Sequence, residues 1–141
     1  MLLDEVMDAV ADRLALIDRI DGRVFAYPPD KVEAPVGIVS YPDAIEFDAT
    51  YGRGTDMIRG LEVTIVEGRV SDRDARDRMA PYVAGAGPGS VKYVLETPSV
   101  EPMPWDDLHV LSVAFDVVTI AGVDYLAATF KIDLAGPGTV T

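Results

Sequence analysis

The single histidine of this sequence, His109, is the residue best suited to proton transfer or metal binding at neutral pH. Asp106 and Asp107 precede it, and in a strand Asp107 and His109 would lie on the same side, which is how a metal site could begin. Such a site needs further ligands at fixed geometry, and the neighbouring residues offer none. The sequence therefore favours an ordinary histidine at the edge of a strand, and we expect no metal.

A glycine-rich segment, Gly85–Gly89, has the composition of a phosphate-binding loop. A Walker loop follows a strand and ends in Gly-Lys-Ser/Thr. Here the glycines follow a helical pattern, and Val91 separates Ser90 from Lys92. The dinucleotide fingerprint also lacks its preceding strand. We interpret the segment as a connector between two helices and expect no nucleotide cofactor.

Nucleophilic catalysis has little support in the sequence. Cysteine is absent, which excludes disulfides, thiolate metal sites and thiolate nucleophiles. A serine–histidine triad would depend on His109, and no Gly-x-Ser-x-Gly elbow exists. The 24 acidic residues permit a carboxylate-pair hydrolase by number, but no pair stands out. We expect a protein that is not an enzyme and needs no cofactor.

The charge balance is strongly acidic, with a formal net charge of −12. Such a surface repels DNA, and no cluster of Lys and Arg interleaved with aromatics offsets it. Asp4, Asp8 and Asp12 recur four residues apart, which predicts an acidic stripe on a helix. A solvated face that aids solubility is the favoured interpretation. A surface that meets a basic partner, or along which DNA passes without sticking, is the alternative.

Length and composition predict one domain over residues 1–141, with 49% apolar residues to build its core. No apolar run is long enough to span a membrane. Asp4 and Glu5 stand where a signal peptide needs basic residues, so we expect no secretion and folding in a reducing cytoplasm.

Apolar periodicity and turn residues predict alternating groups of helices and strands. The first half is expected to contain a helix over 2–20 ended by Gly22, and strands over 24–27, 36–41 and 57–66 with an irregular segment at 42–55. A helix from Ser71 that kinks or stops at Pro81, a short helix capped by Ser90 and an extended connector over 97–105 are expected next. The last third is expected to form a hairpin of 111–117 and 126–134 that turns at Gly122, followed by a short flexible tail over about 136–141. This order predicts an α+β domain, a mainly antiparallel sheet with helices packed on one face.

The hairpin alternation assigns side chains to the two faces of this sheet. Leu111, Val113, Phe115 and Val117 share the face that we expect to lie against the helices. The other face would carry three apolar residues, Val110, Val118 and Ile120. An uncovered apolar face needs a partner, so these residues suggest self-association. Cover by a loop of the same chain is the alternative.

The only tryptophan, Trp105, follows Met103 in the proline-rich connector. Packing into the core of its own chain is the favoured interpretation. An anchor in a neighbouring subunit is the alternative, because tryptophan is enriched among interface hot spots.

Two stretches resemble a known family. One runs from Tyr51-Gly52-Arg53-Gly54-Thr55-Asp56-Met57 through Val70–Met79 and Gly87 to Ser90-Val91-Lys92, and the other is Val113–Phe130. Both resemble the tail-terminator, or head-to-tail connector, proteins of long-tailed (siphovirus-type) phages that infect actinobacteria. With the N-terminal helix, the resemblance covers most of the chain.

The resemblance implies a structural virion protein with a tail-terminator-like fold, which forms a hexameric ring at the neck. The ring would cap the tail tube, join the head-completion (stopper) protein and let DNA pass through its lumen. Contacts between unlike faces close such rings. A stopper or a tail-tube subunit is the first alternative, and a small-ligand binding module unrelated to phages is the second.

Residue roles follow as expectations from this resemblance. We expect the loop with Tyr51, Arg53 and Asp56 to contact the tube or connector, because loops on a rigid scaffold often carry contacts. Met103 and Trp105, with the apolar residues of the outer sheet face, would lie between subunits. Asp4, Asp8 and Asp12 would line an acidic surface.

Overall fold

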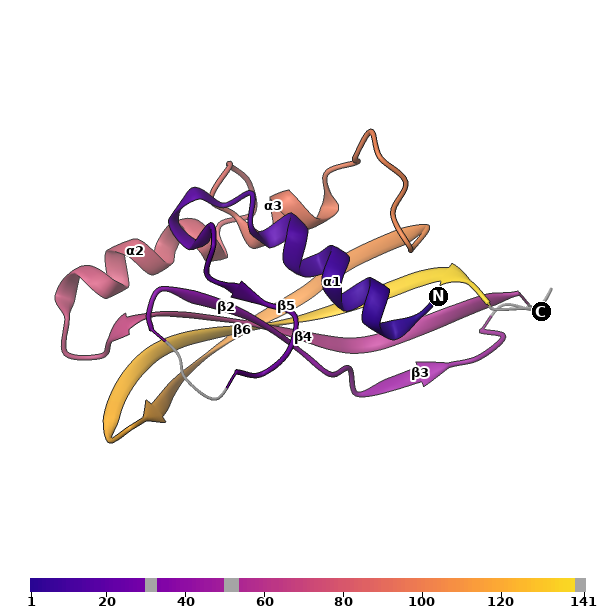
Figure 1. The fold of residues 1–141 in the computed structure, drawn as a ribbon. Coiled ribbons are helices and arrows are strands. Elements are labelled where there is room, and N and C mark those ends of the chain that lie inside the picture. The colour runs from indigo at the N-terminus through magenta and orange to yellow at the C-terminus, as the bar shows by residue number, and fades with distance from the viewer. Residues whose placement is uncertain (30–32, 50–53, 139–141) are drawn as a thin grey trace.

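The computed structural model describes residues 1–29, 33–49 and 54–138, and these form an α+β fold. The helices lie together on one side of a single twisted sheet (Figure 1). They are α1 (Leu3–Leu14), a 3₁₀ turn η1 (Asp18–Ile20), α2 (Arg73–Val83) and α3 (Val91–Glu96). The strands are β1 (Val24–Phe25), β2 (Val36–Ser40), β3 (Ala44–Glu46), β4 (Thr55–Arg69), β5 (Asp107–Ile120) and β6 (Val123–Pro137). The predicted fold class is therefore confirmed.

The sheet has the strand order β1-β2-β4-β6-β5, and β3 pairs with the first part of β4 on the same side as β2. Among the strands of the described residues, only β1 and β2 run parallel; the other pairings are antiparallel. The long strands β4, β5 and β6 form the body of the sheet, while β3 and the β5–β6 turn lie at opposite ends of it (Figure 1). The predicted hairpin is confirmed, with Ala121 and Gly122 at its turn.

The main core lies between the helices and the inner face of the sheet. Val6, Val10 and Leu14 recur along one side of α1 and are buried against β-strand residues such as Leu61 and Ile132. Apolar residues at this spacing give a helix one face to bury, which supplies most of its stability. A smaller cluster of Val36, Val66 and Ala127 lies on the opposite face of the sheet.

The predicted N-terminal helix was too long. Helix α1 ends at Leu14, and the chain then turns into η1. Ile17 and Ile20 are nevertheless buried, because the 3₁₀ turn points them into the same core. The apolar spacing therefore identified core residues correctly, although it did not distinguish one long helix from a helix followed by a tight turn.

Strand β4 is longer than predicted and is interrupted by two irregularities. Its register with β6 shifts between Ile58 and Leu61 and again between Val66 and Gly68. Gly60 occupies the first shift with φ of 69°, and a Cβ there would collide with the Asp43 carboxylate. The second bulge breaks the two-residue period just after Val66, which is why the predicted strand ended there. Strand β3 was missed because all of its residues are exposed.

Three details of α2 differ from the prediction. Asp72, and not Ser71, caps the helix by accepting a hydrogen bond from the Asp74 N–H. The i,i+4 spacing predicts the ion pairs Asp72–Arg76 and Asp74–Arg78, but Arg76 lies beside Asp77 and Arg78 reaches Glu67 and Asp72 instead. The helix runs through Pro81 and ends at Val83, so the predicted stop at Pro81 came two residues too early.

The predictions for α3 and for the start of the tail had opposite outcomes. Ser90 caps α3 by accepting from the Tyr93 N–H, as predicted. The tail begins later than predicted, because β6 continues through Pro137 and the Gly138 N–H donates to the Gly54 carbonyl at 2.7 Å. Residues 139–141 lie outside the described part of the chain.

Candidate assembly surfaces

A bulge in β5 decides which of its side chains reach the core. Val110 pairs with Ile132 and Ser112 pairs with Lys131, so Leu111 has no partner in the ladder. The extra residue reverses the alternation between the two ends of the strand. Val110 is consequently buried against the helices, with 7% of its surface exposed. The prediction that Val110 lies on the outer face was wrong, because the pattern was read through the bulge without a break.

Val118 and Ile120 do lie on the predicted outer face, each partly buried. Val118 packs, together with Phe25, against the small outer cluster around Val66. This part of the face is therefore covered by the chain itself, the alternative that the sequence left open. A role of Val118 and Ile120 between subunits remains a prediction.

The distal part of β5 carries large apolar side chains that the helices do not cover. Phe115 pairs with Ala128 and so lies on the inner face, yet it is 58% exposed while Ala128 is buried. Leu111 and Val117 are also about half exposed. The expectation that these residues line the core was wrong, since the end of the hairpin bends away from the helix layer (Figure 1). We call residues Leu111 to Thr119 distal β5.

Strand β5 is also an edge of the sheet, so one row of its backbone groups faces away from β6. Near the helices this edge is covered, because the Val110 N–H donates to Glu96 Oε2 of α3 at 2.8 Å. Further along, the Val117 N–H donates at 2.8 Å to the carboxylate of its own neighbour, Asp116. The role of Glu96 could not be predicted, because the contact joins residues far apart in the chain.

Glu96 connects α3 to the β5 edge and lies beside Lys92 and His109. The Lys92 ammonium donates to both of its carboxylate oxygens at 2.7 Å, and His109 Nδ1 lies 3.8 Å from Oε2. Partial desolvation raises the pKa of Glu96, but the hydrogen bonds from Lys92 and the Val110 N–H outweigh it, so the pKa lies below its ordinary value. His109 itself is exposed at this edge, as its predicted strand-edge position implied.

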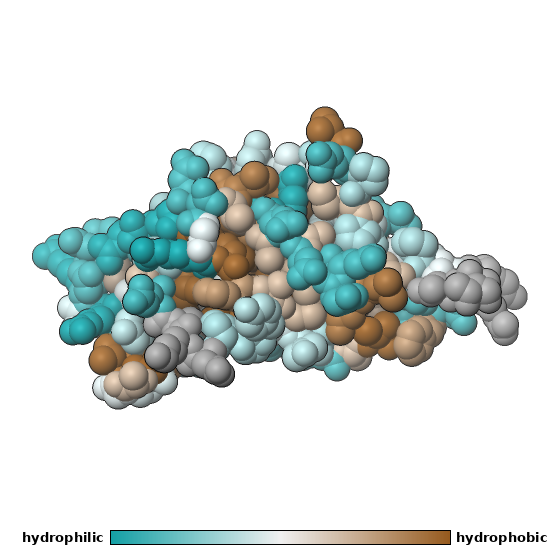
Figure 2. Space-filling view, viewed as in Figure 1, coloured by the Kyte–Doolittle hydropathy of each residue, from teal (hydrophilic) through white to brown (hydrophobic). Residues whose placement is uncertain are grey.

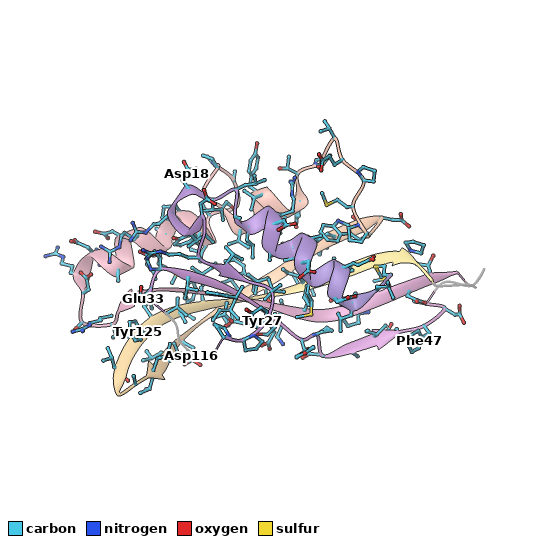
Figure 3. All side chains as sticks on the ribbon, viewed as in Figure 1. Asp18, Tyr27, Glu33, Phe47, Asp116 and Tyr125 are labelled. Atoms are coloured by element: carbon cyan, nitrogen blue, oxygen red, sulfur yellow. The ribbon has the colours of Figure 1, made fainter. Side chains whose placement is uncertain are left out.

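The opposite corner of the sheet has a second exposed apolar group on and beside β3. Ile45 is 37% exposed and Phe47 is 74% exposed. Figure 2 shows apolar side chains gathered over the β3 end and near the hairpin turn of the face that it draws. Figure 3 labels Phe47 at the β3 end and Asp116 on the hairpin, at opposite ends of the sheet. The two apolar edges are therefore well separated.

The carboxylates beside β3 are paired within the chain. Lys131 Nζ lies 3.2 Å from Asp43 and 2.6 Å from Glu62. Arg59 lies 3.3 Å from Glu46 and also contacts Asp133. Each cation is thus shared by two carboxylates, which partly offsets the negative charge beside β3.

Helix α1 carries the predicted acidic stripe on its outward side. Asp4, Asp8 and Asp12 are all exposed, as is Glu5. Within the described residues none of these carboxylates lies within 4.0 Å of a basic group. The favoured interpretation of a solvated face agrees with this exposure, and its lining role in an assembly stays a prediction.

The predicted contact loop is described only in part. Tyr51 and Arg53 lie outside the described residues. Asp56 is 9% exposed at the start of β4, and its Oδ1 accepts a hydrogen bond from the Asp48 N–H at 3.2 Å. Its side chain therefore holds the two ends of the loop together, and a contact with a partner remains a prediction.

Met103 and Trp105 lie in the connector between α3 and β5, and both are partly buried. Trp105 packs against the main core of its own chain. Both side chains line a hollow under this connector, together with Arg13 and Pro98. The favoured interpretation of Trp105 is supported, and a further contact with a neighbouring subunit stays a prediction.

A buried carboxylate, Glu67, joins the sheet to two helical segments. Its Oε1 accepts from Arg19 of η1 and Arg78 of α2, each at 2.7 Å. Its Oε2 and the Tyr82 hydroxyl have no hydrogen-bond partner among the described residues. Burial, and then the nearby Glu67 carboxylate, raise the pKa of Tyr82 above its ordinary value. The sequence did not single out Glu67, because its partners come from distant segments.

The described residues contain no group of three or more His, Asp and Glu side chains placed to hold a metal ion. Gly85–Gly89 joins α2 to α3, as the connector interpretation predicted. In the described part of the chain, no helix has the length and apolarity needed to cross a bilayer.

Together, the fold and the two apolar sheet edges define an α+β protein with one mainly antiparallel sheet, helices on one face, and exposed apolar side chains at two corners. The chain matches no protein-family model and no curated protein sequence.

Proposed function

We propose that this protein is a structural subunit of a phage virion, a tail terminator that joins copies of itself into a ring at the junction of head and tail. The observation that carries the proposal is the pair of exposed apolar edges, distal β5 and β3, on opposite sides of one sheet. A closed ring requires two unlike surfaces on each subunit, and these edges meet that requirement. The sequence resemblance to tail terminators supports the same class.

The acidic exterior fits a ring through which DNA passes. The exposed carboxylates of α1, with no basic partner nearby among the described residues, repel phosphate. In the proposed ring, Asp4, Asp8 and Asp12 face the lumen. The tail-tube protein and the head-completion protein are the proposed partners, and assembly takes place in the host cytoplasm before the protein joins the virion.

A second candidate is a tail-tube subunit, which the same two edges favour. Unlike surfaces on one subunit close into a ring only when the rotation between neighbours allows it, and otherwise they build an open filament. The tube and the terminator therefore differ in the angle between neighbouring subunits and not in the kind of contact.

Native mass spectrometry of the purified protein, with and without isolated tail tubes, tests the proposal alongside electron microscopy of the same samples. We expect a closed ring of fixed mass, in solution or on the end of a tube. Open tubes of variable length would favour the tube subunit. A monomer that ignores tail tubes would contradict both, and would favour a ligand-binding module.

A further inference from the structure

We propose that neighbouring subunits join by adding the β3 edge of one copy to the distal β5 edge of the next, so that the sheet continues from subunit to subunit. The inference rests on the proposed function in one respect, because it takes the partner to be a second copy of this chain. It goes further in naming the two strands that meet.

The distal β5 edge offers backbone groups and apolar side chains in one row. The Val117 N–H donates to a side chain and not to β6, so it faces outward. In an antiparallel ladder this orientation repeats every second residue, which turns the N–H and C=O groups of Val113, Phe115 and Thr119 outward as well. Phe115 and Val117 stand exposed beside this row. A long exposed apolar edge is a template for another strand.

The same strand shows what a covered edge looks like. At Val110 the outward N–H donates to Glu96, so a carboxylate of α3 occupies the place of a neighbouring strand. The Val117 N–H reaches only Asp116, a residue of the same edge. The intramolecular cover therefore stops near the bulge at Leu111, and the rest of the edge stays open to a partner.

The β3 edge is the second half of the proposed contact. Strand β2 pairs with β4 at Glu62–Val66, whereas β3 pairs with β4 at Met57–Arg59, so β1 and β2 do not cover β3. Backbone bonds from Asp43 to Arg59 and from Ala49 to Thr55 hold the segment beside β4 past both ends of β3. In the described chain no strand pairs with its other side. Ile45 and Phe47 supply exposed apolar surface there.

Charge favours these edges over helix α1 for contact between two copies. With a net charge of −12, two copies repel each other wherever unpaired carboxylates meet. On β3, Glu46 is paired with Arg59, and just before it Asp43 is paired with Lys131. Distal β5 contains a single charged residue, Asp116. Contact along α1 would instead bring its unpaired carboxylates together.

Pairing of unlike edges also covers more of the exposed apolar side chains than pairing of two β5 edges. Two β5 edges, antiparallel about Phe115, would place Asp116 opposite Ala114 and so avoid a charge clash. That arrangement closes a dimer and leaves Ile45 and the 74% exposed Phe47 uncovered. Joining β5 to β3 covers both apolar edges and leaves one of each free to continue the assembly.

Cross-linking of single-cysteine variants tests the pairing, because the chain has no cysteine of its own. Phe115→Cys and Ile45→Cys are made separately, mixed in the presence of tail tubes and treated with a short bis-maleimide. Val117→Cys and Phe47→Cys form a second pair at exposed positions, in case one variant of the first pair folds poorly. Asp8→Cys, exposed on α1, replaces either partner as the control.

We expect a cross-linked dimer in the mixtures of β5 and β3 variants, and none for Phe115→Cys alone or with Asp8→Cys. A dimer of Phe115→Cys with itself would overturn the proposal in favour of β5–β5 pairing. Wild-type rings without the β5–β3 product would overturn the pairing and leave the terminator function standing. The β5–β3 product with open filaments would support the pairing and remove the terminator role. A wild-type monomer without any product would overturn both.

Discussion

The two parts of β5 have similar residues and different surroundings. In the first part, Asp107–Val110, the side chains of Leu108 and Val110 are each 7% exposed beneath α3 and its connector. In the distal part, Phe115 and Val117 lie on the same face of the same strand and are 58% and 49% exposed. Alternation therefore indicates which residues share a face, and only the tertiary fold decides whether that face is covered.

On β5 the cover ends at the bulge at Leu111, whereas β4 stays buried as far as Glu67. Glu67 in β4 ties η1 and α2 to the sheet, and Leu111 in β5 shifts the strand out of its regular register. The end of the hairpin bends away from the helices (Figure 1). A covered region stabilises the monomer, and an uncovered apolar region is available to a partner. The predictions below contrast these two regions.

The largest expected difference in the free energy of unfolding is between the alanine variants of two phenylalanines on the same face of neighbouring strands. Phe130→Ala removes a side chain that is 2% exposed and should lower the free energy of unfolding by about 3–5 kcal/mol, since it leaves a cavity. Phe115→Ala should change it by less than about 0.5 kcal/mol, because that side chain is largely solvated already. Urea denaturation of the monomer measures both. Equal losses would mean that the hairpin folds back onto the core.

A smaller loss is expected from Glu67→Gln, at the boundary between the regions. The amide keeps the shape of the side chain, but the hydrogen bonds from Arg19 and Arg78 lose their charge assistance, so we expect about 1–3 kcal/mol of destabilisation. The lower part of this range is favoured because the Arg19 side chain is 43% exposed and solvated.

The matched control is Glu46→Gln, since Glu46 pairs with Arg59 at the surface. We expect no measurable change in the unfolding midpoint there, because exposed ion pairs contribute little. Thermal unfolding of the two variants side by side gives the comparison. A larger shift for Glu46→Gln than for Glu67→Gln would show that Glu67 does not secure η1 and α2 to the sheet.

These contacts also show why the sequence predicted the fold class better than the ends of its elements and the faces of its strands. The hairpin, the core residues of α1 and the cap at Ser90 depend on local spacing, and local spacing is visible in a sequence. The bulge at Leu111 adds one residue without any local signal, and it places Val110 on the face opposite to the predicted one. The turn after Leu14 depends on packing against the sheet, which the helical period cannot report.

The candidate surfaces were predictable only in part for the same reason. Val118 and Ile120 reach the expected face because they lie beyond the bulge, in the part of the strand where the predicted alternation holds. The apolar β3 edge was not predicted, since Ile45 and Phe47 lie in a short segment without alternation. Glu96 could not be found from the sequence, because its contact with Val110 spans the whole connector.

Glu96→Gln should have a modest effect that depends on pH. The pKa of Glu96 is lowered in the folded chain, so its ionised form stabilises the protein above the unfolded pKa, whose ordinary value is 4.5. This contribution is lost as the pH falls from about that value through the folded pKa. The variant keeps an acceptor for the Val110 N–H, so we expect a loss of less than about 1.5 kcal/mol at pH 7.

Unfolding free energies of wild type and Glu96→Gln, measured from pH 3 to pH 7, isolate this group from the other carboxylates. The difference should shrink toward acid pH. A difference that stays constant would mean that the Glu96 charge does not stabilise the covered part of the edge.

The smallest expected effect on stability comes from Val117→Thr in distal β5. Threonine has the shape and the β-branched backbone preference of valine, and at a site that is 49% exposed its hydroxyl can reach water. The free energy of unfolding should therefore change by less than about 0.5 kcal/mol. A strand that joins another copy has a different requirement, since burial of an added hydroxyl without a partner opposes association. We accordingly expect a normal urea midpoint together with a lower yield of the β5–β3 cross-link, when Val117→Thr is added to Phe115→Cys. A loss of monomer stability above about 1 kcal/mol would instead place Val117 under cover within its own chain, and the contrast between the two parts of β5 would disappear.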